Sequence, residues 1–220
     1  MGTLKRRAVV SALIVLQALW MPARAETALS GVSTSDAALV SQITARLARA
    51  KGVRARFTQT QKLAAMKAPL VSVGSLLFFR DRGVIWQVDT PYRKTWVIGD
   101  SGIVAIDAGG ARLSNGAAQG SRGAVEIAKM MRAMLGGDLS ALYSQFDVEA
   151  SGSQSRWQMR LVPRQPQIAQ SLRAIQMDGG DFLKSLSITL ANGDVTQFDF
   201  SGSEEVDELT PADQKNFGTR

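Results

Sequence analysis

The stretch that decides the fold is Leu70–Thr90, LVSVGSLLFFRDRGVIWQVDT. It starts with an apolar run that ends in Leu76–Phe79, turns at residues 81–83, and returns as Val84–Val88. Short runs rich in Val, Ile, Phe and Trp that flank a glycine-containing turn predict two paired antiparallel strands. This hairpin indicates a β protein, and the sequence on both sides of it continues the pattern.

Further short strands are expected along the chain. The last two are joined by Asn192-Gly193, a strong signal for a tight hairpin. Because the runs are short and mostly lack long helical segments between them, they favour an antiparallel sheet over βαβ units. We therefore expect a mainly β (α+β) fold with a long antiparallel sheet that curls and has a concave face. The expected strands are residues 53–59, 70–79, 84–88, 95–98, 103–107, 146–149, 157–161, 174–177, 186–190 and 195–200.

Two stretches have helical spacing instead. Leu39, Ile43 and Leu47 fall on one face of a helix that we expect to end at Gly52. The spacing also predicts a second helix at residues 124–135, with an unusually wide apolar stripe, and a short helical piece that follows through about residue 143. Such a stripe usually packs on the core, but methionine also adapts to apolar ligands, so a lid over a cavity is the alternative. The stripe includes Ile127, Met130, Met131 and Met134.

The first 25 residues predict a cleaved secretory signal peptide. Lys5–Arg7 are basic, Ala8–Trp20 is apolar, and Ala23 and Ala25 have the spacing that signal peptidase recognises. The alternative is a membrane anchor, but the apolar run is shorter than the roughly 20 residues of a spanning helix. We expect a soluble mature protein outside the cytoplasmic membrane, with one domain at residues 26–200 and a polar, disordered tail at 201–220.

Composition excludes most kinds of chemistry. The sequence has no histidine and no cysteine, so it lacks Ser-His-Asp and Cys-His nucleophile systems, thiolate metal sites and disulfides. Signal cleavage leaves 22 basic residues against 19 acidic ones, which argues against nucleic-acid binding. Acidic pairs such as Asp178 and Asp181 predict surface charge rather than catalysis. We expect no catalytic residue, no metal and no cofactor; a carboxylate-based hydrolase is the alternative.

Three further residues have two interpretations each. By alternation Arg80 shares a strand face with Leu76 and Phe78, so it is either a solvated strand end or an arginine held beside an apolar cavity by acceptors such as helix carbonyls. Trp86 and Trp96 lie in successive strands and belong either to the core or to a cavity wall.

The order of these residues resembles the LolA family, the periplasmic carriers of outer-membrane lipoproteins. The resemblance spans about Ala37–Phe200 and is sharpest over residues 53–102. Asp81 stands where the family usually has proline, and residues 163–193 look like a divergent LolA-related branch. The residues that carry it are Phe57-Thr58-Gln59, Gly74-x-Leu76-x-x-x-Arg80, Trp86, Pro91 and Trp96-Val97-Ile98-Gly99-Asp100-x-Gly102.

The resemblance implies an incomplete, half-open β-barrel, covered by an N-terminal helix and a central helical lid, around an apolar cavity for acyl chains. Arg80 matches the family arginine that holds the lid to the barrel. The cavity lining that we expect consists of Leu76, Phe78, Trp86, Trp96, Ile98, Ile127, Met130, Met131 and Met134.

The implied function is to carry lipoprotein acyl chains through the periplasm from the inner to the outer membrane. The implied partners are acylated lipoproteins, an inner-membrane release complex as donor and an outer-membrane receptor as acceptor. We expect a monomer. An alternative keeps the fold and changes the cargo to a glycolipid or a polyene-type lipid.

Overall fold

The computed structural model of this protein describes residues 34–99, 102–113 and 140–218, all within the compact unit Gly31–Arg220. The predicted signal peptide at 1–25 and the predicted helix at 124–135 lie outside the described residues. Within those ranges no helix has the length and apolar character that crossing a bilayer requires.

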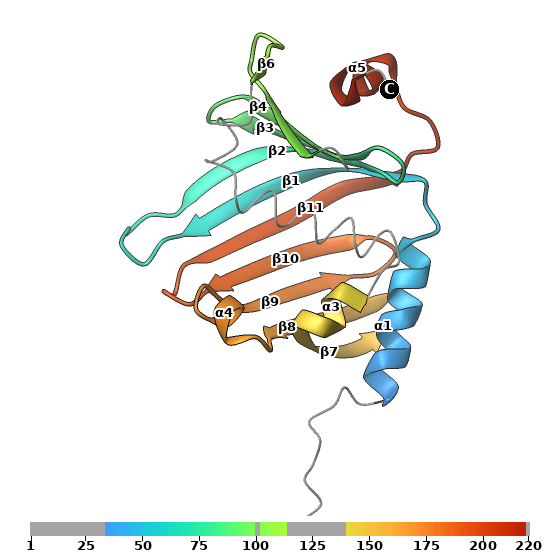
Figure 1. Ribbon diagram of the computed structural model, residues 1–220, viewed down its shortest axis with the longest axis vertical. Helices are drawn as coiled ribbons and strands as arrows, with labels where there is room; N and C mark the ends of the chain where they lie inside the picture. The colour runs from blue at the N-terminus through green and yellow to red at the C-terminus, as the bar shows by residue number, and fades with distance from the viewer. Residues whose placement is uncertain (1–33, 100–101, 114–139, 219–220) are drawn as a thin grey trace, which may run out of the picture. The chain divides into compact units, whose positions relative to one another are not determined.

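A single antiparallel sheet dominates the described part of the chain (Figure 1). Its strand order is β6-β5-β4-β3-β2-β1-β11-β10-β9-β8-β7. Every adjacent pair of strands is consecutive in sequence except β1 and β11, and β6 and β7, which are consecutive among the described strands, lie at opposite edges. The strands are β1 (Gly52–Lys62), β2 (Leu70–Phe79), β3 (Gly83–Thr90), β4 (Lys94–Gly99), β5 (Gly102–Ile106), β6 (Arg112–Leu113), β7 (Phe146–Ser153), β8 (Arg156–Pro163), β9 (Leu172–Gly179), β10 (Leu183–Leu190) and β11 (Val195–Glu205).

The sheet confirms the prediction of a mainly β, antiparallel fold. Each strand expected from the sequence is present, and β10 turns into β11 at Asn192-Gly193, where Gly193 has a φ of 92°. Among the described strands β6 and β7 form the two edges, so the sheet is not closed. The two-residue strand β6 was not predicted.

Four described helices accompany the sheet: α1 (Thr34–Leu47), α3 (Ser140–Gln145), α4 (Pro166–Ala169) and α5 (Pro211–Phe217). Val40, Ile43 and Leu47 of α1 are buried, as the helical spacing predicts. However, α1 ends at Leu47, so Gly52 does not end the helix. Gly52 begins β1, where a Cβ would lie 2.7 Å from the Phe78 carbonyl oxygen, and this close approach of two backbones explains the glycine.

The prediction of a disordered tail differs from the structure. Strand β11 continues to Glu205, and α5 follows it. Thr210 caps α5 by accepting from the Asp213 backbone N–H, while the Asp213 carboxylate accepts from the Thr210 backbone N–H, and Pro211 occupies the first turn. This capping box orders a helix that is too short to show a periodic pattern.

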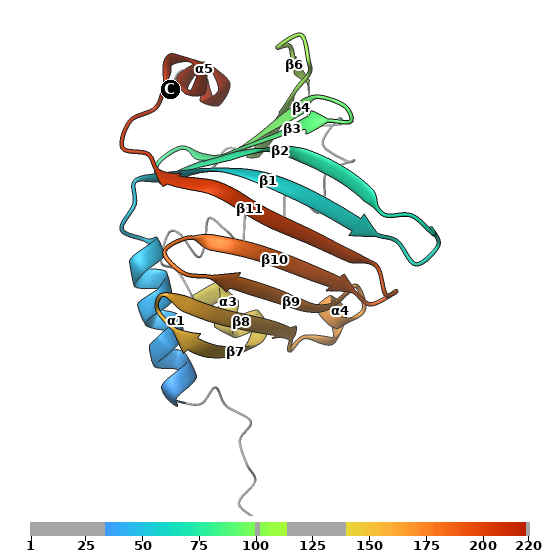
Figure 2. The same ribbon diagram turned by 180° about the vertical axis from the view of Figure 1, so that it is seen from behind.

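The described helices α1, α3 and α5 define the two faces of the sheet (Figures 1 and 2). We call one the α1 face, because Leu47 of α1 and Leu142 of α3 join a large apolar cluster there. We call the other the α5 face, because Phe217 of α5 packs there on a small cluster from β2 to β5.

Candidate functional site

The α1 face carries one continuous apolar cluster that crosses the sheet. It arises from alternation, because every second residue of a strand faces the same side. Strand β8 shows this plainly: Trp157, Met159 and Leu161 are buried, whereas Arg156, Gln158 and Arg160 are exposed. The buried members of the α1-face cluster are Val40, Ile43, Leu47, Phe57, Leu76, Phe78, Val84, Trp86, Trp96, Ile98, Ala105, Leu142, Val148, Trp157, Met159, Leu161, Ile175, Met177, Leu186 and Phe198.

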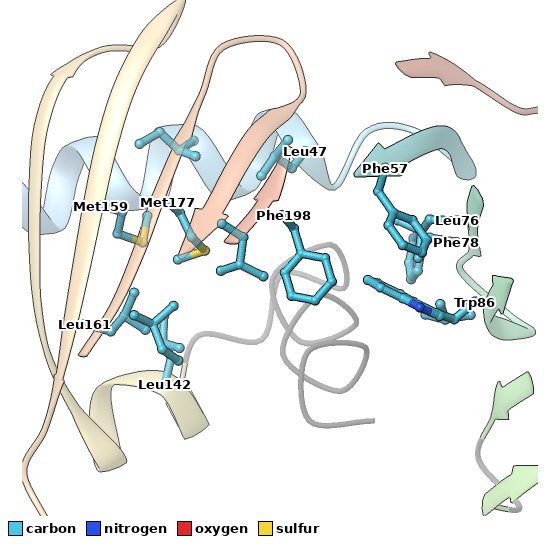
Figure 3. Packing of buried hydrophobic residues seen from close by; sticks show 14 of the residues in the cluster. Leu47, Phe57, Leu76, Phe78, Trp86, Leu142, Met159, Leu161, Met177 and Phe198 are labelled. Carbon is cyan, nitrogen blue, oxygen red and sulfur yellow. The ribbon is translucent and has the colours of Figure 1, made fainter. Parts of the chain in front are cut away.

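An aromatic group occupies the middle of this cluster. The ring centroids of Phe57 and Trp86 lie 4.4 Å apart, and Phe198 meets Trp86 edge-on at 5.3 Å. Figure 3 shows Phe198 between the group around Trp86 and a second group that includes Met159 and Met177. Phe198 belongs to β11 and Phe57 to β1, so the pairing of these two strands joins the two halves of the apolar face.

Five of the predicted cavity residues lie together on the α1 face. Leu76, Phe78, Trp86, Trp96 and Ile98 are all buried in its cluster. The other four, Ile127, Met130, Met131 and Met134, lie outside the described residues. The sequence-based set omitted cluster members from β1 and from β7–β11, although alternation in β8 indicated that Trp157, Met159 and Leu161 face one side.

Close packing explains why position 74 of the family-like motif is a glycine. A Cβ at this position would lie 2.0 Å from the Gln87 carbonyl oxygen and 2.7 Å from the Phe57 ring. The β2–β3 register also shifts between Val73 and Gly74. Glycine therefore lets the irregular strand pass close to β3 and to the central aromatic group.

Gly179 and Gly180 also contact the α1-face cluster. A Cβ on Gly179 would lie 2.3 Å from the Trp157 ring, and the Trp157 Nε1–H donates to the Gly180 carbonyl oxygen at 3.0 Å. This glycine pair therefore seats a buried tryptophan and satisfies its polar atom.

Trp96, unlike Trp157, has an indole N–H that is not hydrogen-bonded to any described residue. Its side chain is 8% exposed, and its Nε1–H has no hydrogen-bond partner in the described part of the chain. The Lys94 ammonium lies 5.3 Å from the centre of its ring, a cation–π contact that leaves the N–H unused. Buried polar groups without a partner are rare in native proteins and require an explanation.

Arg80 contacts α1 rather than a cavity. It is an exposed residue, and its guanidinium donates to the backbone carbonyl oxygens of Ala48 and, at 3.1 Å, of Ala50, just beyond the end of α1. Backbone carbonyls of this kind are what an arginine beside apolar residues needs, but the sequence did not identify which carbonyls accept. A cation near the carbonyl end of a helix is stabilising. Any contact between Arg80 and the predicted helix at 124–135 lies outside the described residues.

The α5 face is apolar over a much smaller area. Leu77, Ile85, Val97 and Ile106 are buried there, and Phe217 is among the residues that cover them. One arginine of the β2–β3 turn and one of β6 hold the α5 segment: Arg82 Nη2 donates to the Gly218 carbonyl oxygen at 2.5 Å and Arg112 Nη2 to that of Asn216 at 2.7 Å.

Arg54 adds an ion pair to this cover. Its Nη2 lies 2.7 Å from Oδ2 of Asp213, which is itself buried. Burial raises the pKa of Asp213, but hydrogen bonds from Thr210 and Arg54 and the charge of Arg54 outweigh it, so the pKa lies below the usual value of 3.8. The carboxylate is therefore charged at neutral pH and helps to hold α5.

The titratable groups near α1 and α3 have structural roles. Burial raises the pKa of the Tyr143 phenol, and the charge of Asp36 raises it further, so Tyr143 is neutral at physiological pH. Asp178 accepts from the Ser185 hydroxyl at 2.8 Å, and Asp181 pairs with Arg46.

Within residues 34–99, 102–113 and 140–218 no three Asp or Glu side chains gather as a metal site requires. A surface pocket is lined mostly by polar side chains, from α1 (Gln42, Ala45, Arg46), from Arg49 just after it and from Gln154 in the β7–β8 turn.

Comparison with known families gives one match. The model of the family described as "Outer membrane lipoprotein carrier protein LolA-like" matches residues 32–206. A search of curated proteins finds no match.

Solved structures give weaker similarities. MucB is similar with a TM-score of 0.50 and 15% identity, over 83% of this chain and 63% of its own. The Pseudomonas aeruginosa MucA/MucB complex gives 0.46 and 14% over 82% and 61%, and a LolA superfamily protein from Nitrosomonas europaea gives 0.44 and 7% over 83% and 98%. This chain thus spans roughly 60% of the MucB chains that it matches. At such identities the likeness to MucB shows a shared fold alone.

Proposed function

Because the chain belongs to the LolA-like family of outer-membrane lipoprotein carriers, we propose that it holds lipoprotein acyl chains on its α1 face and ferries them across the periplasm. This family consists of periplasmic carrier proteins rather than enzymes. The observation that supports the proposal is the apolar cluster that runs without interruption from β5 to β7 on one face of an open sheet.

The need for such a face follows from the cost of hydrating an acyl chain. Each CH₂ that leaves water gains roughly 0.8 kcal/mol, so a chain with about 15 of them resists entering water by about 12 kcal/mol. That corresponds to a factor of about 10⁹ in partition, which would keep an acyl chain in its membrane. A carrier must replace the bilayer with an apolar surface of its own.

A carrier must also release what it binds. We propose that Arg80 holds the end of α1 in the empty protein, through the carbonyl oxygens of Ala48 and Ala50, and that loading displaces this contact. The free energy spent in breaking it offsets part of the gain from burying the acyl chain. The cargo then stays transferable, because a ligand that must shift a conformational equilibrium binds less tightly by that amount.

The partners follow from the same proposal. An inner-membrane complex would load the carrier and an outer-membrane receptor would unload it. MucB has been solved in complex with MucA, so a protein of this fold also binds a protein partner in that case.

Identification of the bound lipid tests the proposed function. The mature protein is purified from the periplasm without detergent, and its lipid extract is analysed by mass spectrometry. Acyl anchors of lipoproteins support the proposal. A glycolipid or a polyene-type lipid would assign the alternative cargo, and a lipid-free protein that also takes up no acylated peptide would contradict a carrier function.

Two neighbouring residues provide a matched pair of variants. Ile103 is half-buried and packs against the α1-face cluster, whereas the half-buried Val104 follows it on β5 and faces the other side. We expect Ile103→Asn to weaken binding of an acylated peptide at least fivefold and Val104→Asn to change it less than twofold. Equal effects would show that the acyl chain does not lie on the α1 face.

A further inference from the structure

The buried indole N–H of Trp96 requires an acceptor that the described residues do not supply. The cross-strand neighbours of Trp96 are Trp86 on β3 and Ala105 on β5. An indole can only donate and a methyl group can do neither, so both neighbours fail as acceptors. Asp107, further along the chain from Ala105, instead accepts from the Ala111 backbone N–H at 2.9 Å.

A buried water molecule would be a poor acceptor for the Trp96 Nε1–H. A buried water molecule needs two to four polar partners. The residues that flank Trp96 diagonally on the α1 face include Val84, Val88 and Ile103, which offer none. A water molecule bound to Nε1 would exchange one unsatisfied group for another.

We propose that the Trp96 Nε1–H donates to the carbonyl oxygen of the acyl group in the bound lipid. This inference rests on the proposed function and narrows its substrate class to O-acyl or N-acyl compounds. In such molecules the carbonyl is the one strong acceptor attached directly to the apolar chain. A chain lying on the α1 face can therefore carry its acceptor into apolar surroundings where Trp96 needs it.

The same hydrogen bond gives discrimination between cargo classes. A polyene hydrocarbon has no acceptor, and an ether oxygen is a poorer one than an ester carbonyl. The Trp96 N–H is already unpaired in the empty protein, so a ligand with a carbonyl gains a hydrogen bond that a ligand without an acceptor does not. Trp96 would thus favour acylated cargo over alkyl cargo of equal length.

The test compares two probes that differ in the carbonyl alone: 1-palmitoylglycerol, an ester, and 1-O-hexadecylglycerol, its ether counterpart. Both are titrated below their critical micelle concentrations into the full-length mature protein with ¹⁵N-labelled tryptophan. We expect the ester to bind between about twofold and about tenfold more tightly than the ether. We also expect the Trp96 Nε1–H resonance to move downfield with the ester and to move much less with the ether.

Variants of adjacent residues complete the experiment. Trp96→Phe identifies the resonance and should reduce the ratio of the ester to the ether affinity to about one. Val97→Ala changes a buried neighbour on the opposite face, in the α5-face cluster, and should leave the ratio as in the wild type. The ratio of ester to ether affinity in the wild type requires no variant, so the comparison of the two probes stands even if the Trp96→Phe protein fails to fold.

Three results would overturn the inference. If the wild type binds both probes equally and the Trp96 resonance does not respond to the ester, the hydrogen bond is absent although the carrier function stands. If Trp96→Phe keeps the ester preference, another donor provides it. If neither probe binds, the proposed function itself fails and the inference fails with it.

Discussion

The two faces of the sheet are both apolar at β2–β5, yet they are built differently. The α1 face is apolar from one side of the sheet to the other, with large aromatic and methionine side chains and with helices above it. The α5 face has four buried residues in its described cluster, all from β2 to β5, and becomes polar on strands such as β8. Polar contacts occur on both sides: Arg54 and Arg112, on separate strands, hold the α5 segment, and Arg80 contacts the end of α1.

In the proposed function the α1 face holds the cargo, whereas the α5 face is covered by a helix of the chain itself. A patch the size of the α5-face cluster is buried by one short helix, and its charged contacts fix that helix in one place. The α1-face cluster runs from β5 to β7, whereas α1 and α3 contact the sheet mainly at β7. The proposed carrier requires an apolar face of this extent. The following predictions test this contrast, beginning with the largest effect on stability.

The largest effect is expected at the centre of the α1 face. Trp86→Ala should lower the free energy of unfolding by about 3–5 kcal/mol, because it removes a fully buried ring that contacts Phe57 and Phe198. Urea unfolding followed by circular dichroism measures the loss. A loss below about 1 kcal/mol would show that this face is loosely packed at its centre and would remove the contrast with the α5 face.

A smaller effect is expected on the α5 face. The double variant Leu209→Ser/Phe217→Ser should cost about 2 kcal/mol, because both side chains are half-buried and ordering the segment offsets part of the gain. Binding of an acylated peptide should change less than twofold. If binding falls as strongly as stability, the α5 face takes part in cargo binding and the two faces do not divide as described.

The Arg54–Asp213 pair predicts a pH dependence for the α5 cover. The folded-state pKa of Asp213 is lowered, so its contribution is fully present above the usual value of 3.8 and disappears as pH falls through the lower folded-state pKa. Asp213→Asn should cost about 1 kcal/mol at pH 7, at the modest end because Arg54 is partly exposed. Unfolding measured from pH 2 to pH 7 should show the difference between wild type and variant vanish at the acid end. A difference that stays constant over this range would mean that the charge of Asp213 does not matter.

The smallest stability effect is expected in the β2–β3 turn, whose arginines contact the end of α1 and the end of α5. Arg80 contacts the end of α1, whereas Arg82, two residues later, contacts Gly218 after α5. Arg80→Leu and Arg82→Leu should each cost less than about 1 kcal/mol, since both contacts are partly exposed. Only Arg80→Leu should change the uptake or the release of an acylated peptide. Unchanged transfer in Arg80→Leu would refute the proposed release mechanism.

Most of the sheet could be predicted from local sequence patterns. Alternation such as that of Trp157, Met159 and Leu161 indicates both a strand and its buried side. The seven residues of α5 span two turns at most, which is too short to show a helical periodicity. The capping-box residues Thr210 and Asp213 were nevertheless recognisable in the sequence. The two residues of β6 give no pattern at all.

The candidate site was harder to predict, because its two halves meet through strands that are distant in sequence. No local pattern tells that Phe198 packs on Trp86. The acceptors of Arg80 were equally hidden, since backbone carbonyls have no residue type. The unpaired Nε1–H of Trp96 depends on what surrounds it in three dimensions, and sequence alone left that residue equally compatible with core and cavity wall.

The pairing of β1 with β11 also determines how the sheet can fold. Hairpins on either side of it join neighbours in the chain and can form early, but Phe57 opposite Phe200 joins residues from nearly opposite ends of the described chain. Contacts of such sequence separation form slowly, because loop closure must come first. A chain made from its N-terminus therefore holds β1 as an exposed edge until β11 has been synthesised. During that interval the half of the apolar face on β1–β5 is open to other chains, so assistance during folding would matter most at this strand.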